Sequence, residues 1–133
     1  MKKEKNTYVI NAITTPDGTQ LRSFHRHDCK THVDEVSGEV YMVDGGSAYL
    51  RRNKNEHPYI ENSKKLSDVD DFQELRELIH WGSYGKHGKS KLKWVVLSEM
   101  SNDHIKAILN SNQQVIWEDE FKQELEFRKE NNI

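Results

Sequence analysis

Residues 24–46, FHRHDCKTHVDEVSGEVYMVDGG, form the stretch around which the fold and the candidate chemistry are organised. It contains three of the seven histidines, five acidic residues and the single cysteine, Cys29. The apolar run from Val40 to Val43 is typical of a strand, and Gly45 with Gly46 is expected to end it. The stretch therefore predicts hairpin strands, separated by turns, that carry many polar side chains.

The residues before this stretch predict a hairpin. Residues 15–18, TPDG, have the composition of a tight turn, because proline presets φ and glycine tolerates positive φ. We expect an antiparallel sheet built from residues 7–13, 19–27 and 39–43. If the strand 19–27 is continuous, His25 and His27 lie on the same face of it.

The second half of the chain has helical signals. Ser67 is expected to cap a helix over 67–80, and Ser101 a helix over 102–110. Apolar residues at helical spacing predict a last helix over 115–130. The fold class is therefore α+β, a small antiparallel sheet of hairpins followed by two or three helices, in a single domain over 1–133. Residues 53–66 are expected to form a mobile connector, which would be the seam in an alternative two-part arrangement. Residues 81–91 are expected to form a hairpin loop, followed by a strand over 92–97.

The composition limits the classes of function. The chain has 133 residues, of which 34% are hydrophobic and 32% charged, with a net charge of −2. A small core is expected, and an overall basic protein that coats nucleic acid is disfavoured. One cysteine cannot form an internal disulfide, and no apolar run reaches the length of a membrane span. These features predict a cytoplasmic protein without membrane contact.

The first candidate site is a cluster of imidazole and carboxylate groups. Such groups are the ligands that Zn²⁺ and Mn²⁺ accept, and they suit a metal-dependent hydrolase or nuclease. The alternative is a polar hairpin whose side chains pair locally, and the spacing matches no established metal motif. We therefore expect no metal and no cofactor. The residues of this candidate are His25, His27, Asp28, His32 and Asp34.

A second candidate is a basic hairpin over 84–94 for nucleic acid. Lysines neutralise phosphates and aromatic rings stack on bases, whereas the alternative is a solvated turn whose aromatic residues belong to the core. A functional surface at His104 is a weaker candidate than a role in capping the helix that Ser101 begins. The hairpin candidate consists of Lys86, Lys89, Lys91, Lys93 and Trp94.

A third candidate is a protein-binding surface. Arginine and tyrosine are enriched at binding hot spots, and both flank the polar stretch. The alternative is that these arginines neutralise acidic residues inside the fold. The candidate binding residues are Arg22, Arg26, Arg51, Arg52, Tyr41 and Tyr49.

Five segments, TPDGTQLRSFHRHD, YMVDGG, YLRRN, HWGSYGKHGK and LSEMSNDHIKAIL, resemble uncharacterised small accessory proteins of tailed bacteriophages and prophages. The resemblance covers most of residues 13–110. It implies an accessory protein that acts in the cytoplasm of the infected host, and it supplies no catalytic residues. The leading hypothesis is a protein without catalysis that binds a host or phage macromolecule, with a protein as the expected partner. The alternatives are the metal-dependent hydrolase or nuclease and the nucleic-acid-binding hairpin.

Overall fold

The computed structural model describes residues 7–85, 89–111 and 115–133, and these form two compact units. The N-terminal unit ends at Asp70 and the C-terminal unit begins at Asp71. Antiparallel strands and helices are both present, so the predicted α+β class is confirmed. The alternative two-part arrangement placed its seam within 53–66. The boundary between the two units lies just beyond that segment, after Asp70. None of the described helices has the length and apolar character that a membrane crossing requires.

The N-terminal unit begins with the predicted hairpin. Strand β1 (Tyr8–Thr14) pairs antiparallel with β2 (Gln20–Ser23), with Ile13 opposite Leu21. The turn closes through a hydrogen bond of 2.9 Å from the N–H of Gly18 to the carbonyl of Thr15. Gly18 has φ of +90°, the conformation that glycine adopts without steric cost.

The described strands of the N-terminal unit are divided between two sheets, so the prediction of one sheet containing both 7–13 and 39–43 was wrong. The first sheet also includes β6 (Ile60–Glu61) and β7 (Lys64–Lys65), both antiparallel to β1. Two short pieces of the predicted connector 53–66 are therefore part of a sheet. The second sheet has the order β3-β4-β5, formed by Lys30–Val33, Val40–Asp44 and Arg51–Arg52.

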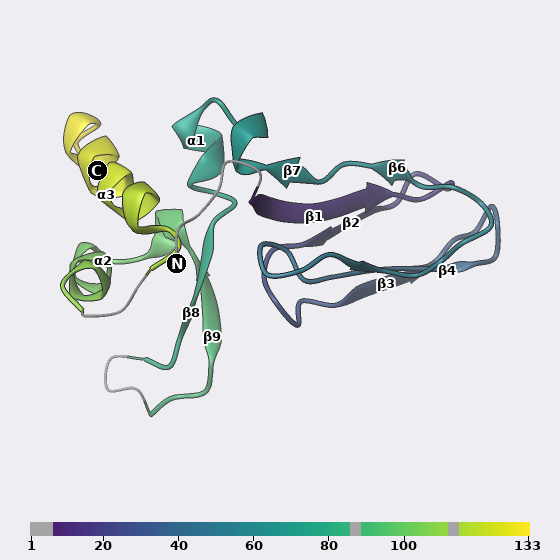
Figure 1. Cartoon of the computed structure of the whole chain (residues 1–133), viewed down its shortest axis with the longest axis horizontal. Helices are drawn as coiled ribbons and strands as arrows, with labels where there is room; N and C mark the ends of the chain where they lie inside the picture. The colour runs from purple at the N-terminus through teal and green to yellow at the C-terminus, as the bar shows by residue number, and fades with distance from the viewer. Residues whose placement is uncertain (1–6, 86–88, 112–114) are drawn as a thin grey trace. The chain divides into compact units, whose positions relative to one another are not determined.

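The two sheets pack against each other through a small apolar core. Ile13 and Leu21 from the first sheet meet Tyr41 and Val43 from the second, and Tyr59 packs against this cluster. In Figure 1 the sheet of β1 and β2 lies over the sheet of β3 and β4. Side chains alternate between the two faces of a strand. Val40 and Met42, which neighbour Tyr41 and Val43 along β4, therefore point away from this core.

Strand β2 is shorter than predicted because the chain turns after Ser23. The carboxylate of Asp28 accepts the N–H of Phe24 at 2.9 Å, and His27 has φ of +64°. A residue with this φ cannot continue a strand, so the prediction of a continuous strand 19–27 was wrong. The turn after β4 approaches the segment after β2 closely. A Cβ atom at Gly46 would lie only 2.4 Å from the carbonyl carbon of Phe24.

The C-terminal unit joins a hairpin to helices. The hairpin consists of β8 (His80–Ser83) and β9 (Lys93–Val96), and the helices are α1 (Phe72–Leu75), α2 (Asn102–Leu109) and α3 (Glu118–Glu130). A short 3-10 turn, η2 (Leu97–Glu99), precedes α2, and another, η1 (Leu66–Asp68), lies at the end of the N-terminal unit before α1. The hydroxyl oxygen of Ser101 accepts the N–H of His104, as expected for an N-cap. The last two predicted helices are therefore confirmed within a few residues.

The predicted helix over 67–80 was wrong. The cap is Asp71 rather than Ser67, and α1 contains only one turn. The carbonyl of Arg76, which a continuing helix would need, accepts the N–H of Ser98 at 3.0 Å. The carbonyl of Ile79 accepts the N–H of Leu97 at 2.8 Å. At Arg76 a hydrogen bond with η2 therefore takes the place of the bond that the predicted helix would make, and the bond from Leu97 fixes the chain that follows as it enters β8.

A buried carboxylate ties the C-terminal unit together. Glu124 in α3 is completely buried and receives two hydrogen bonds from Arg76, at 2.8 and 2.7 Å. Arg128, one turn later, donates to the same carboxylate at 2.5 Å. It also donates to Asn102 and to the carbonyl of Leu97. These bonds connect the segment after α1, η2 and the start of α2 to α3.

We expect the variant Glu124→Gln to lower the free energy of unfolding by about 3–5 kcal/mol, because it leaves two buried guanidinium groups without their anion. The matched control is Glu118→Gln, at the exposed Glu118–Lys122 pair of the same helix, with an expected change within about 0.5 kcal/mol. All three tryptophans lie after residue 70, so urea unfolding followed by tryptophan fluorescence reports on this unit. Equal effects of the two variants would contradict the role given to Glu124.

Candidate functional site

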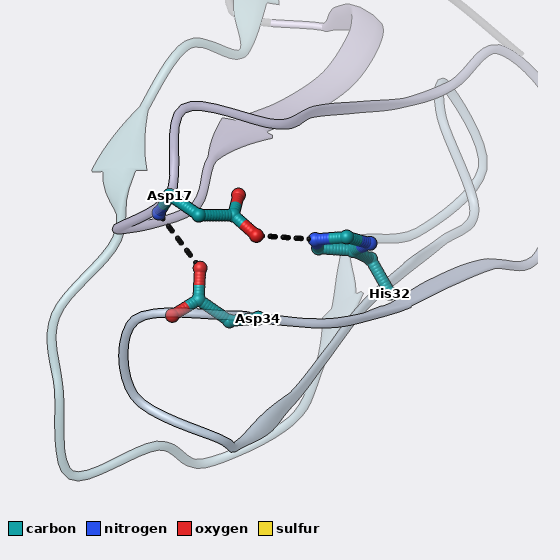
Figure 2. Close-up of side chains that lie close together, drawn as sticks. All are labelled: Asp17, His32 and Asp34. Atoms are coloured by element: carbon teal, nitrogen blue, oxygen red, sulfur yellow. Dashed lines mark hydrogen bonds and ion pairs between the residues drawn. The ribbon is translucent and has the colours of Figure 1, made fainter.

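Asp17, His32 and Asp34 are the one group of three potential metal ligands that the described ranges bring within 4.8 Å. Asp17 comes from the turn between β1 and β2, His32 from β3, and Asp34 from the start of the β3–β4 turn. Figure 2 shows the carboxylate of Asp17 directed at the ring of His32, with Nε2 and Oδ2 2.7 Å apart. A carboxylate oxygen of Asp34 accepts the N–H of Asp17 at 2.7 Å.

The carboxylate of Asp17 is fully engaged by the protein. One oxygen accepts the hydroxyl of Thr15 and the N–H of Thr19, at 2.7 and 2.9 Å. The other accepts from His32 and from the N–H of Glu35, at 2.7 and 2.9 Å. A carboxylate has about four lone-pair sites, and here each has a donor. A metal ion at Asp17 would have to displace one of these hydrogen bonds.

Asp34 is almost as fully engaged, and it is completely buried. Besides the bond from Asp17, it accepts the N–H and the hydroxyl of Ser37, at 2.7 and 2.8 Å. The bond from the N–H of Asp17 joins the β1–β2 turn to the β3–β4 turn. The hydrogen bonds of Asp17, His32 and Asp34 therefore hold the two turns together, and we call these three residues the clasp. Because their lone pairs are used in this way, a structural role is favoured over an open metal site.

Hydrogen bonding sets the charge state of the clasp. The N–H of Glu35 and the hydroxyl of Thr15, with the His32 ring, hold the pKa of Asp17 well below its usual range. The pKa of Asp34 is also lowered, because hydrogen bonds from Ser37 and Asp17 outweigh the effect of burial. Both carboxylates are therefore anionic at neutral pH. Their contribution to stability is present above the ordinary carboxyl pKa and is lost as the pH falls below it.

The other histidines of the predicted cluster have separate partners. Nε2 of His25 lies 3.9 Å from the carboxylate of Asp28, which also pairs with Lys30. Nδ1 of His27 lies 3.5 Å from the hydroxyl of Tyr49. The turn after β2 removes the shared strand face on which the grouping of His25 with His27 depended. Of the predicted ligands, His32 and Asp34 are brought together, and Asp17 is the partner that the sequence analysis treated only as a turn residue.

Two members of the predicted binding surface lie inside the N-terminal unit. Tyr41 is completely buried, and its hydroxyl donates to the carbonyl of His57 at 2.6 Å. The guanidinium of Arg52 donates twice to Glu61, at 2.8 and 2.9 Å, and to the side-chain oxygen of Asn11 at 2.7 Å. Asn11 in turn donates to the carbonyl of Asp44 at 3.0 Å. These bonds connect β1, β4, β5 and β6, which is a structural role.

The remaining members of the predicted surface are exposed. Arg22, Arg26 and Tyr49 are accessible, and the Arg51 side chain is 70% exposed although it lies 3.7 Å from a carboxylate oxygen of Asp44. Arg22 is on the first sheet and points away from the core, whereas Arg51 is on the second. The exposed arginines Arg22 and Arg51 therefore belong to two different sheets, and Arg26 and Tyr49 lie in the segments between strands.

An apolar surface that no sequence pattern indicated lies at the β3–β4 hairpin of the second sheet. We call it the valine face, and it consists of Val33, Val36 and Val40. Val33 and Val40 are directly paired across β3 and β4 and are 62% and 46% exposed. Val36, in the turn that joins these strands, is 71% exposed. Alternation places Val33 and Val40 on the side away from Tyr41. Three large exposed apolar side chains at one hairpin are unusual, because such groups are normally scattered.

The predicted basic hairpin is present as β8 and β9, with Ser83 opposite Lys93. Lys89, Lys91 and Lys93 are exposed, and Lys86 lies outside the described residues. Trp94 neighbours Lys93 along β9 and thus faces the opposite side of the ribbon, where its ring lies over Gly82. Lys93 and Trp94 therefore do not form one phosphate-and-base surface.

Comparisons of the chain with protein-family models, with curated proteins and with solved structures found no match in any of the three.

We expect addition of Zn²⁺ or Mn²⁺ to leave the melting temperature of the purified protein unchanged, because the lone pairs of Asp17 are already used. Elemental analysis is expected to find no stoichiometric metal. About one metal ion per chain, lost in the variant His32→Ala, would contradict the assignment of the clasp as structural.

The pairing with Arg52 lowers the pKa of Glu61 from 4.5 to about 2. Because this pKa is lowered in the folded state, the pair stabilises the N-terminal unit above pH 4.5 and this stabilisation is lost as the pH falls towards 2. NMR titration of the side-chain carboxyl carbon measures the value directly. In Arg52→Gln the pKa is expected to return towards 4.5, whereas an unchanged value would mean that Arg52 is not its cause.

Proposed function

We propose that this chain is an accessory protein without catalysis that binds another protein through the valine face. The observation that carries the proposal is the exposure of Val33, Val36 and Val40 on one hairpin. Burying such side chains against a partner releases water from apolar surface, which is the main driving force for protein association. The partner is thus expected to present apolar side chains of its own.

The neighbourhood of the valine face supports a specific contact. Met42 lies two residues after Val40 and on the same side of β4. Asp44 lies two residues after Met42, and its register partner on β5 is Arg51. The guanidinium of Arg51 is mostly exposed and can form bidentate hydrogen bonds with a carboxylate of the partner. An apolar centre with an arginine at its border resembles the core and rim of protein interfaces.

The two alternatives have less support from the geometry. The hydrolase or nuclease alternative requires open ligand positions, and the carboxylates of Asp17 and Asp34 are engaged by backbone and side-chain donors. The nucleic-acid alternative requires lysines beside stacking rings, and Lys93 and Trp94 face opposite sides. The resemblance to phage accessory proteins agrees with a protein that binds a host or phage protein in the cytoplasm of the infected cell.

The proposal predicts loss of a partner when the valine face is made polar. We expect Val33→Thr with Val40→Thr to abolish recovery of the partner, because threonine keeps the branched shape and strand preference but buries less apolar surface. The matched control is Ile60→Thr, since Ile60 is 63% exposed on β6 and Val33 is 62% exposed on β3. The measurement is affinity purification from infected cells, with nuclease treatment in a parallel sample.

Three outcomes would contradict the proposal. The first is equal recovery of the partner by the valine variant and by wild type. The second is equal loss with Ile60→Thr, which would indicate general stickiness. The third is loss of the partner on nuclease treatment, which would indicate a bridge of nucleic acid.

A further inference from the structure

The C-terminal unit contains a pocket of about 760 Å³ between the β8–β9 hairpin and the first turns of α2. Its volume lies in the range of small-molecule sites, roughly 300–1,000 Å³. The hairpin contributes Ser83, Ser90, Lys91 and Lys93, and α2 contributes Asp103 and His104. Two features that the sequence analysis treated separately, the basic hairpin and His104, therefore line one pocket.

The charges of the pocket favour an anion at the hairpin side. Within the described ranges, neither Lys91 nor Lys93 forms an ion pair with a carboxylate, and both are exposed. Ser83 lies opposite Lys93 in the β8–β9 register, so its hydroxyl is on the same side of the ribbon. Ammonium and hydroxyl groups together are donors that suit the oxygens of a phosphate.

The opposite wall favours a neutral polar group. Asp103 is an exposed acceptor in the first turn of α2, and a carboxylate accepts hydrogen bonds from ligand hydroxyls while it repels a second phosphate. Val95 and Ala107 add apolar surface to the lining. The pocket thus combines a cationic side, a hydroxyl-accepting side and an apolar part.

We propose that this pocket binds a phosphorylated small molecule that carries free hydroxyls, of the size of a nucleoside monophosphate. Its phosphate lies at Lys91 and Lys93, and its hydroxyls face Asp103. This site is independent of the valine face, which lies in the N-terminal unit. A nucleic-acid strand is the less favoured ligand, because Trp94 is on the other side of the ribbon from Lys93.

The test is NMR titration of the full chain with AMP, compared with adenosine, which lacks the phosphate. We expect AMP to shift the amide signals of the lining residues and adenosine to bind at least about tenfold more weakly, since charge-assisted hydrogen bonds to phosphate are the strong ones. The variant Lys91→Gln with Lys93→Gln is expected to weaken AMP binding by at least about tenfold. The matched control, Lys106→Gln with Lys129→Gln, removes the same charge at exposed positions outside the pocket and is expected to keep AMP affinity.

Four results would overturn the proposal. Absence of AMP binding at millimolar concentration would remove the site, and equal affinity for adenosine would remove the phosphate from its recognition. Equal weakening in the control variant would show a general effect of net charge. A short oligothymidine that binds much more tightly than AMP, and whose binding is lost in the Lys91→Gln, Lys93→Gln variant, would assign the pocket to nucleic acid. The amide spectrum of each variant also shows whether it is folded.

Discussion

The constraint on which both units depend is the scarcity of apolar residues. Only 34% of the chain is hydrophobic, so polar side chains must share the interior, and each needs a partner because an unpaired buried polar group costs free energy. Glu124 meets this requirement with two arginines, and Asn11 with Arg52 and a backbone carbonyl. Asp34 meets it with Ser37 and with the N–H of Asp17 in the β1–β2 turn. Elements far apart in the sequence are held in register by these directional bonds as much as by apolar packing.

Local signals in the sequence predicted the features that local interactions determine. The TPDG turn and the pairing of β1 with β2 depend on residues within about fifteen positions, and so does the capping of α2 by Ser101. The helix over 67–80 failed for the opposite reason. Its periodicity is real, but Ser98 donates to the carbonyl of Arg76, which the helix would use. Helical preference is a weak term that such tertiary bonds override.

The candidate sites show the same limit. Alternation along β4 indicates that one face is buried, but it does not say which, so Tyr41 was assigned to the surface and the exposure of Val40 was missed. Arg52 is likewise indistinguishable from Arg51 in sequence, and only the position of Glu61 decides that one is internal and the other exposed. The composition of the His/Asp stretch did indicate a polar cluster. Asp17 joined it because a turn brought it within reach of His32, fifteen residues away.

The pairing of β1 with β6 and β7 has a consequence for how the chain can be divided. A polar segment such as 53–66 is where a protein is usually shortened or cleaved. A fragment that ended before Ile60 would remove both partners from one edge of β1, whose residues Val9 to Ile13 are all buried in the intact chain. An uncovered edge with these side chains is a template for pairing between molecules. Such a fragment is therefore prone to aggregate, and the N-terminal unit extends as far as Asp70.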